Sequence, residues 1–269
     1  GKMMELETGQ CTIMELKKEN VKELAQVFKT VAFKDTGTWH ASEAGMKITV
    51  DDGSYQLASV FINPAFFSSF KVREEIVSMK ISIKSISEFL SISENSSSSV
   101  KVSYPGMFQP VKMLVEDADG WVARGNFTTT LADQELDFEF DDAGVLATYL
   151  LKTQVLKEII KDFDDTSRTV RIQFTKNSLC FTTFGDVGET TVSIPSRSLQ
   201  MESVKCLEEV EFSYLLSLIQ RMTTAFILAT KLILRVDERG VLSCQFSIDH
   251  GEGNASYIEF LTVPADEEE

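Results

Sequence analysis

The sequence predicts an α+β protein that contains two copies of one domain, with helices collected on one face of antiparallel sheets. Its first support is a helical segment that occurs twice. "LKKENVKELAQVF" begins at Leu16 and "LKTQVLKEIIKDF" begins at Leu151, and five of their 13 positions are identical. The second support is that each half of the chain combines several short strands of alternating polarity with two apolar helices.

The elements follow the same order in both halves. In the first half, "CTIMELK" leads into the repeated helix, and the strands "TGTWHAS", "GMKITVDD" and "YQLASVF" follow. In the second half, "GVLATYLLK" precedes the helix, and "TVRIQFT", "SLCFTTFG" and "ETTVSIP" follow. Each half then has a strand that runs into a second helix, "ISIKSI" from Ile81 and "FSYLLS" from Phe212. We predict helices at residues 20–32, 84–92, 153–164 and 214–226.

A third pair of segments completes the repeat. "KMLV…DGWV" from Lys112 is aligned with "KLIL…RGVL" from Lys231, each predicted to be two strands joined by a charged turn. An ordered repeat of this length indicates two homologous domains. We place the first domain at 1–130 and the second at 145–269, ending in an acidic tail. The segment "LADQELDFEFDDAG", residues 131–144, is predicted to be an extended connector between them.

The composition limits the class of protein. With 43% hydrophobic and 25% charged residues the chain is predicted to be globular. The most apolar stretch, "TAFILATKLIL", is interrupted by Lys231 and is too short to cross a membrane, so no membrane partner is expected. A signal-peptide pattern is not found, and the four cysteines lack C-x-x-C spacing, so we expect an intracellular protein with reduced thiols.

Catalytic chemistry is not predicted. The chain has two histidines, His40 and His250, and contains no G-x-S-x-G, P-loop or G-x-G-x-x-G motif. Its paired acids fall at expected strand ends and loops, where turn chemistry explains them. We therefore expect no catalytic residue, metal or cofactor. A metal-dependent 3′–5′ exonuclease is the alternative from another class, and it requires carboxylates that converge on metal ions.

Basic residues are biased toward the predicted helices, although the net charge of −15 argues against a protein coated in positive charge. Lys22 follows Lys18 by four residues and precedes Lys29 by seven, so helical spacing predicts that all three lysines form one stripe opposite the apolar one. A row of lysines of this kind contacts phosphates without reading bases. The ordinary alternative is a solvated helix face. The predicted DNA-facing set comprises Lys18, Lys22, Lys29, Lys84, Lys157, Lys161 and Arg221.

With this pattern the chain resembles the sliding-clamp family, whose repeated domains are joined by a connector and closed into a ring around duplex DNA. The ending "SYIEFLTVPADEEE" is similar to the last strand and tail of the replicative clamp, PCNA. The stretches "KITVDDGSYQLASVFI", "FFSSFKVREEIVSMKISI", "LDFEF", "FTTFGDVGETTVSIP" and "DERGVLSCQF" are similar to the Rad-one type subunit of the 9-1-1 DNA-damage checkpoint clamp.

The resemblance implies roles for specific residues. Lys22, Lys29 and Lys161 match DNA-facing lysines of PCNA, whereas Glu88 and Ser91 stand where PCNA has lysines. This departure suits a specialised subunit better than a symmetric self-trimer. The strands that meet neighbouring subunits are expected in "WVARGNFT" and "GETTVSIP", with these interface residues: Trp121, Val122, Ala123, Arg124, Thr190, Thr191, Val192 and Ser193.

The connector is expected to border a pocket for client peptides. Leu136, Phe138 and Phe140 alternate with acids along it, and clamps recruit partners at this region together with residues near the tail, here Val263 and Pro264. The alternative is that the two phenylalanines pin the connector to the sheet.

The resemblance implies a nuclear, non-catalytic subunit of a heterotrimeric clamp that encircles DNA at damage sites. Its expected partners are two paralogous clamp subunits, a clamp loader, double-stranded DNA bound without sequence preference, and checkpoint and repair client proteins. A homotrimeric replication processivity clamp is the alternative within the same class.

Overall fold

The computed structural model describes residues 12–53, 55–93, 97–133 and 140–266. Within these residues, the first half contains two α-helices, a short 3₁₀-helix and ten strands in this order: β1 (Met14–Lys18), α1 (Val21–Val31), β2 (Thr36–Ser42), β3 (Gly45–Asp51), β4 (Gln56–Ile62), η1 (Pro64–Phe66), β5 (Ser69–Val72), β6 (Val77–Ser82), α2 (Ile83–Ser91), β7 (Ser99–Tyr104), β8 (Val111–Glu116), β9 (Val122–Phe127) and β10 (Thr129–Thr130).

The second half repeats the plan within the described residues. Its order is β11 (Val145–Lys152), α3 (Thr153–Lys161), β12 (Thr169–Phe174), β13 (Ser178–Gly185), β14 (Gly188–Pro195), β15 (Met201–Cys206), β16 (Val210–Leu215), α4 (Leu216–Arg221), η2 (Met222–Ile227), β17 (Lys231–Asp237), β18 (Leu242–Asp249) and β19 (Ala255–Thr262).

Strand pairing follows the same order in the two halves, apart from β10, which pairs with β6 and has no counterpart among the described strands of the second half. β1 lies between β5 and β7, and β11 lies between β15 and β17. The order β6-β2-β3-β4 of the first half corresponds to β16-β12-β13-β14 of the second, and β7-β8-β9 corresponds to β17-β18-β19. The predicted internal repeat is therefore confirmed as a repeat of topology.

The repeated helical segments occupy equivalent places. At the offset predicted from the sequence, buried Val21, Leu24 and Phe28 correspond to buried Leu156, Ile159 and Phe163. Both helices pack an apolar stripe against the sheets because their hydrophobic residues recur with helical spacing, and Phe163 continues the stripe two residues beyond the end of α3.

One predicted correspondence was wrong. The segment from Lys112 forms β8, and the segment from Lys231 forms β17, whereas the topological equivalent of β17 is β7. Successive hairpins of one antiparallel sheet share the same alternation of polarity, so a short alternating pattern matches either neighbour equally well. The alignment of these two segments was displaced by one strand.

The first two helices lie where the sequence predicted them, within one residue at each end. Asn20 begins α1 by accepting a hydrogen bond at its side chain from the backbone N–H of Lys22 (3.1 Å). α3 ends at Lys161 rather than at residue 164. The Asp164 side chain accepts from both the backbone N–H and the hydroxyl of Thr166 (2.9 and 2.6 Å), and this local turn competes with further helix.

The fourth predicted helix, 214–226, begins two residues later and divides. Tyr214 remains in β16, where it pairs with Val170 and its buried hydroxyl donates to the carbonyl oxygen of Gly240 (2.7 Å). The α-helical part ends at Arg221, and the chain continues as the 3₁₀-helix η2.

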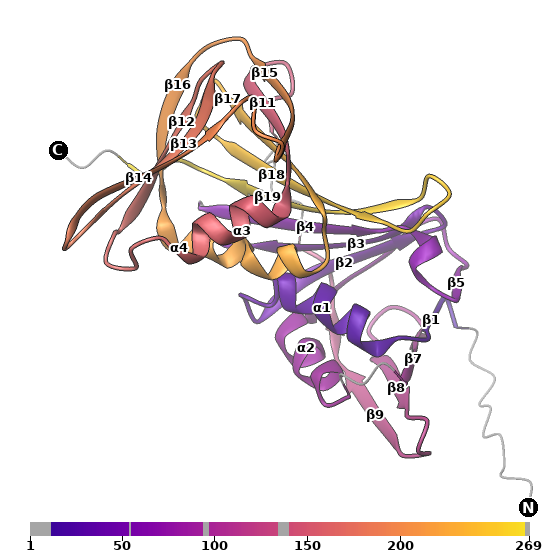
Figure 1. Ribbon diagram of the computed structural model, residues 1–269. Helices are drawn as coiled ribbons and strands as arrows, with labels where there is room; N and C mark the ends of the chain where they lie inside the picture. Colours follow the sequence, from indigo (N-terminus) through magenta and orange to yellow (C-terminus); the bar gives the residue numbers. More distant parts are fainter. Residues whose placement is uncertain (1–11, 54, 94–96, 134–139, 267–269) are drawn as a thin grey trace, which may run out of the picture.

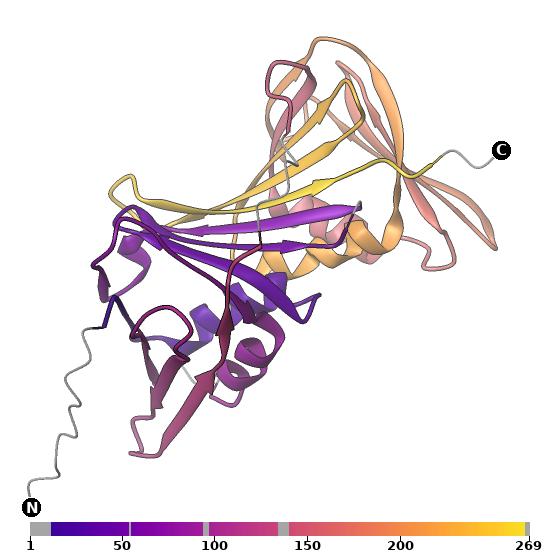
Figure 2. The ribbon, with the colours of Figure 1, turned by 180° about the vertical axis from the view of Figure 1, so that it is seen from behind.

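The two halves are joined by one continuous sheet. β4 pairs antiparallel with β19 from Gln56↔Thr262 to Phe61↔Tyr257, and this seam creates a ten-stranded sheet in the order β10-β6-β2-β3-β4-β19-β18-β17-β11-β15. Figures 1 and 2 show this sheet crossing from one half to the other, with the helices of both halves gathered on one side of it.

Side chains reinforce the seam at its helical side. Gln56 is buried, and its amide donates to Leu218 O (3.2 Å) and Thr262 Oγ1 (2.9 Å). The Arg221 guanidinium donates to Gln56 Oε1 (3.1 Å) and Asp52 Oδ2 (2.8 Å) and stacks over Phe33 (4.2 Å). A residue at the start of β4 thus holds the second helix of the other half.

Replacing Gln56 with leucine should lower the free energy of unfolding by about 2–4 kcal/mol, because a carbonyl, a hydroxyl and a guanidinium N–H lose their partner in a buried setting. Urea unfolding of the full chain measures the change. Gln173→Leu, an exposed glutamine on β12, is the matched control and should alter stability by less than about 0.5 kcal/mol. Equal effects of the two substitutions would contradict the role given to Gln56.

Candidate nucleic-acid interface and subunit edges

The helices of the two halves form a common face. α1 contacts α2 and η2, and α3 contacts η2 and α4, so the helices lie next to one another along one side of the molecule (Figure 1). Lys22 on α1 and Lys157 on α3 occupy equivalent positions in the repeat, and Lys161 lies one turn further along α3. All three side chains are exposed, and none makes an ion pair with another described residue.

Two other predicted DNA-facing cations are engaged within the protein. Lys18 lies in β1, so its placement on the helical stripe was wrong. Its ammonium donates to Phe66 O (2.7 Å), pairs with Glu23 (2.5 Å) and lies 4.0 Å from the centre of the Phe66 ring. Arg221 is held at the junction by Asp52, Gln56 and Phe33, as described above. Both cations therefore have an acidic partner within the chain, Glu23 for Lys18 and Asp52 for Arg221.

The remaining two members of the set differ in exposure. Lys29 is half-buried in the last turn of α1, whereas Lys84 is exposed in the first turn of α2, where its Nζ lies 4.0 Å from Asp35 Oδ1. Glu88 is also exposed on α2. The exposed lysines of the set that make no ion pair with a described residue are therefore Lys22 on α1 and Lys157 and Lys161 on α3.

Paired acids in the described residues serve the fold. Burial opposes ionisation of Asp52, but hydrogen bonds from Lys34 and Arg221 outweigh it and lower the pKa of this carboxyl. The Ser98 hydroxyl donates to Asp117 (2.5 Å) and lowers the pKa of that carboxyl, and Asp117 also accepts from the backbone N–H of Asp119. No group of three or more His, Cys, Asp or Glu side chains suited to a metal ion occurs in residues 12–53, 55–93, 97–133 and 140–266.

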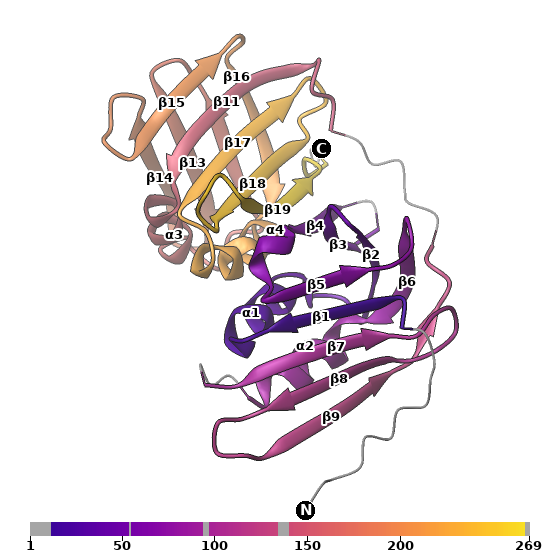
Figure 3. The ribbon, with the colours of Figure 1, turned by 90° about the vertical axis from the view of Figure 1, so that its right-hand side faces the viewer.

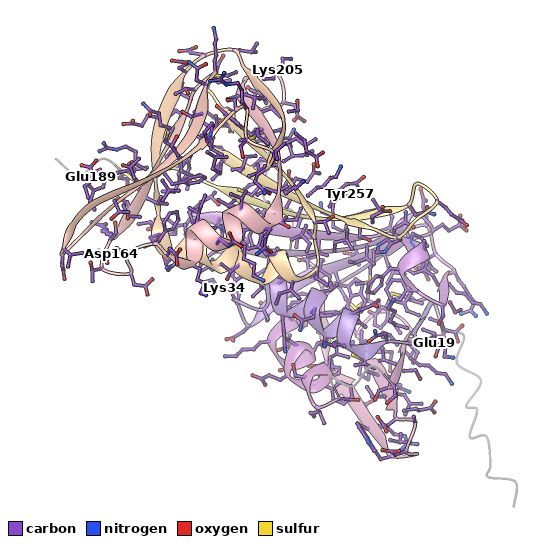
Figure 4. The ribbon with its side chains drawn as sticks, in the orientation of Figure 1. Glu19, Lys34, Asp164, Glu189, Lys205 and Tyr257 are labelled. Carbon is purple, nitrogen blue, oxygen red and sulfur yellow. The ribbon has the colours of Figure 1, made fainter. Side chains whose placement is uncertain are left out.

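The predicted interface strands lie at sheet edges. β9 is the last strand of the five-stranded sheet β5-β1-β7-β8-β9, and β14 is the last strand of the four-stranded sheet β14-β13-β12-β16. Trp121 directly precedes β9, and both it and Val122 are about two-fifths exposed. Arg124, Thr190, Thr191 and Ser193 are exposed, and Ala123 and Val192 are half-buried. Figure 4 shows Glu189 on β14, at the end of the second half remote from the first.

The edge strands β9 and β14 differ from their counterparts in the other half of the repeat, because those counterparts pair with each other. Within the chain, β4 of the first half pairs with β19 of the second. The equivalent of β4 is β14, and the equivalent of β19 is β9. β14 and β9 are therefore the two strands that lack, among the described residues, the neighbour that their counterparts have.

The hairpin register shows which backbone groups of β14 face outward. Gly185 pairs with Gly188 across a two-residue loop, an arrangement whose closing pair exchanges hydrogen bonds. Because such pairs alternate along an antiparallel ladder, the N–H and C=O groups of Thr191 point away from β13. The close Oγ1–Oγ1 distance of Thr182 and Thr191 (2.9 Å) agrees with a non-hydrogen-bonded pair.

The predicted client pocket is only partly within the described residues. Leu136 and Phe138 lie outside them. The Phe140 ring is half-buried under the Arg235 guanidinium (4.6 Å). Val263 and Pro264 are half-buried, and the backbone N–H of Val263 donates to Tyr55 O (3.0 Å). Sequence reasoning missed Tyr55, whose side chain is 56% exposed beside this segment; a large aromatic next to the Asp52-Gly53 turn was the available signal.

The described helices include none that is long and apolar enough to span a membrane.

The arrangement of two equivalent domains with helices on one side and sheets on the other is the fold of sliding clamps. A solved structure of Proliferating Cellular Nuclear Antigen from Entamoeba histolytica superposes with a TM-score of 0.79 over 95% of this chain and 100% of that one, at 18% sequence identity. The predicted fold class is thereby confirmed.

The chain belongs to the family described as "Repair protein Rad1/Rec1/Rad17", whose model matches residues 13–248. It is 29% identical over 256 residues to the cell cycle checkpoint protein RAD1 of Homo sapiens, and the alignment covers 93% of this chain and 90% of the human protein. The DNA repair protein Rad1 of Drosophila melanogaster is 23% identical, with 91% and 92% covered. These findings confirm the resemblance found in the sequence.

Proposed function

We propose that the chain is a non-catalytic subunit of a heterotrimeric ring that encircles duplex DNA at damage sites in the nucleus. The observation that carries this proposal is the seam between β4 and β19. The same kind of seam can form between chains if β9 of one subunit pairs with β14 of the next. Contacts of this head-to-tail type close into a ring when the rotation between subunits suits.

The edges of the described sheets support this assembly. An unpaired edge strand is a hazard for aggregation unless it is covered or blunted. β14 is eight residues long, its outer positions carry threonine and serine, and no lysine interrupts it. A partner strand from another clamp subunit would satisfy its outward backbone groups.

The helical face supports sequence-independent DNA binding. In a ring of this design the helices line the central opening, and Lys22, Lys157 and Lys161 contact phosphates. Lys29 and Lys84 stand at the margins of the same surface. The exposed Glu88 and the engaged Lys18 and Arg221 make this surface sparsely basic, which favours a ring shared with different subunits over a homotrimer.

Loading by a clamp loader and recruitment of checkpoint and repair clients belong to the same proposal. Tyr55, Val263 and Pro264, with Phe140 at the far end of the connector, mark the region where clients would bind. Hydrogen exchange with and without a client peptide distinguishes the two alternatives. Slower exchange of this region in the presence of the peptide supports a client site, whereas unchanged exchange supports a connector that is only packed against the sheet.

The mass of the assembly tests the proposed function. We expect the purified chain to be monomeric at micromolar concentration and to form a 1:1:1 complex with two other clamp subunits, as measured by sedimentation equilibrium. A stable homotrimer of this chain alone would favour the processivity-clamp alternative. Metal-dependent digestion of DNA by the purified chain would instead favour the exonuclease alternative.

A further inference from the structure

The solvent-facing side of the five-stranded sheet carries a hollow of about 520 Å³ with an unusual charge. Figure 3 shows this sheet from its outer side, with α1 and α2 behind it. Five cations border the hollow, and together they are called the basic face: Lys17, Lys71, Lys101, Lys112 and Arg124. In a chain of net charge −15, so many cations on one sheet face are unexpected.

Ion pairs within the described residues neutralise few of the cations of the basic face. Lys17 lies directly opposite Lys101 across β1 and β7, and like charges at opposite positions destabilise a sheet. Glu15 is the acid that lines the hollow, and it pairs with Arg73 (2.7 Å). Lys17 pairs with Glu19 (2.6 Å). The hydrogen bond from Lys17 and the positive charge of Lys17 lower the pKa of Glu19, although desolvation of this carboxyl acts in the opposite direction. The other four cations make no ion pair with a described residue.

The second half of the chain provides an internal reference. The strand registers keep lysines at two of the five positions, because Lys152 is equivalent to Lys17 and Lys231 to Lys101. Ser203 stands at the position equivalent to Lys71, beside a bulge at Glu202, and Glu202 forms an ion pair with Lys231 (3.0 Å). Continuing across the sheet, Gln245 and Tyr257 take the places of Lys112 and Arg124. Two of the five cations thus recur in the second half, whereas Lys71, Lys112 and Arg124 have uncharged counterparts there, so these three cations are specific to the first half.

We propose that the basic face is a docking site for an acidic peptide segment of a protein partner. The hollow has the size of a site that takes a few side chains. Its cations lie on alternate positions of neighbouring strands, where they can meet carboxylates spaced along an extended chain. Leu114, half-buried between Lys101 and Arg124, adds an apolar contact at the floor.

A peptide fits this surface better than a nucleic acid does. Proteins that hold single strands without sequence preference combine a basic groove with aromatic side chains on which bases stack. The residues that line this hollow include no aromatic side chain. The proposed duplex contacts lie on the helices, behind the sheet in the view of Figure 3. The basic face is therefore separate from the DNA-facing surface.

Fluorescence anisotropy with a labelled acidic peptide tests the proposal on the full isolated chain. The probe is an extended peptide of about 12 residues in which glutamate alternates with leucine and serine, long enough to cross the sheet. The Lys71→Glu, Lys101→Glu, Lys112→Glu variant should bind this probe at least about tenfold more weakly at moderate ionic strength. The same positions changed to glutamine should give an intermediate loss, and melting temperatures of both variants should stay close to that of the parent.

The matched control reverses three lysines on the helical face instead, Lys22→Glu, Lys157→Glu and Lys161→Glu, with the same change in net charge. It should bind the acidic peptide as the parent chain does. If both variants lose the same affinity for the acidic peptide, the effect comes from net charge alone, and the proposal is overturned. A labelled single-stranded oligonucleotide is measured on the same proteins. If the basic-face variant loses binding of the oligonucleotide but keeps binding of the peptide, the surface is a nucleic-acid site and the proposal is overturned. No ring is needed, so this result is independent of the proposed assembly.

Discussion

A chain carrying Thr191→Pro should fold and yet fail to enter the ring. The Thr191 N–H faces away from β13, so proline at this position removes no hydrogen bond within the sheet. It does remove a donor from the proposed ladder with the neighbouring subunit, and its ring obstructs the approaching strand. We expect the loss to reach about 3 kcal/mol or more, which corresponds to an affinity at least about 100-fold weaker.

Analytical ultracentrifugation of the variant with its partner subunits measures this loss, and Thr191→Val is the control because it keeps the N–H and the strand preference. Arg124→Pro is the companion variant on β9, where Arg124 occupies the corresponding outward position. Each proline should weaken contact with one neighbour and leave the other contact intact. Normal assembly of both proline variants would exclude edge pairing as the mode of ring closure.

The second large effect is expected for the Lys22→Glu, Lys157→Glu, Lys161→Glu variant. Each lysine that neutralises a phosphate contributes about 0.9 to the slope of log affinity against log salt concentration. Loss of three contacts should lower that slope by about 3, and the added negative charge should reduce DNA retention by the assembled ring about 100-fold at low salt.

Retention of the ring on circular duplex DNA over a salt series measures the effect. The Lys71→Glu, Lys101→Glu, Lys112→Glu variant has the same net charge and should retain DNA as the parent does. Equal retention by the helical-face variant and the parent at every salt concentration would mean that these helix lysines form an ordinary solvated surface.

The features predicted well from the sequence are those with a local physical cause. The spacing of Val21, Leu24 and Phe28 fixes the buried stripe of α1, and the same spacing recurs at Leu156 and Ile159. Periodicity of this kind depends on a few neighbouring residues, so it can be read before any tertiary contact is known.

Contacts between distant residues were not accessible in this way. Arg221 appears in the sequence as one more helical cation, and its partners Asp52 and Gln56 are separated from it by more than half the chain. Lys18 was assigned to a helix because strand β1 and helix α1 follow each other without a break in polar pattern. In the same manner, alternation identified strand β8 but could not tell which strand of the second half is its equivalent.

The basic face was missed for a related reason. Its five cations come from five strands, and in the sequence each stands among ordinary alternating residues. Only the register brings Lys17 opposite Lys101 and places Lys112 and Arg124 on the same side of the sheet. The charge surplus becomes visible when the two halves are compared position by position.

The seam between β4 and β19 has a kinetic consequence for a ring assembled from such chains. Its two strands belong to one polypeptide, so the tether holds them at a high effective concentration and the joint reforms quickly after any local opening. Joints between separate chains have no tether, and their lifetime depends on the concentration of free subunits and on dissociation rate alone. An opening large enough to admit a DNA duplex is therefore expected at a boundary between chains, with each two-domain subunit moving as an unbroken arc.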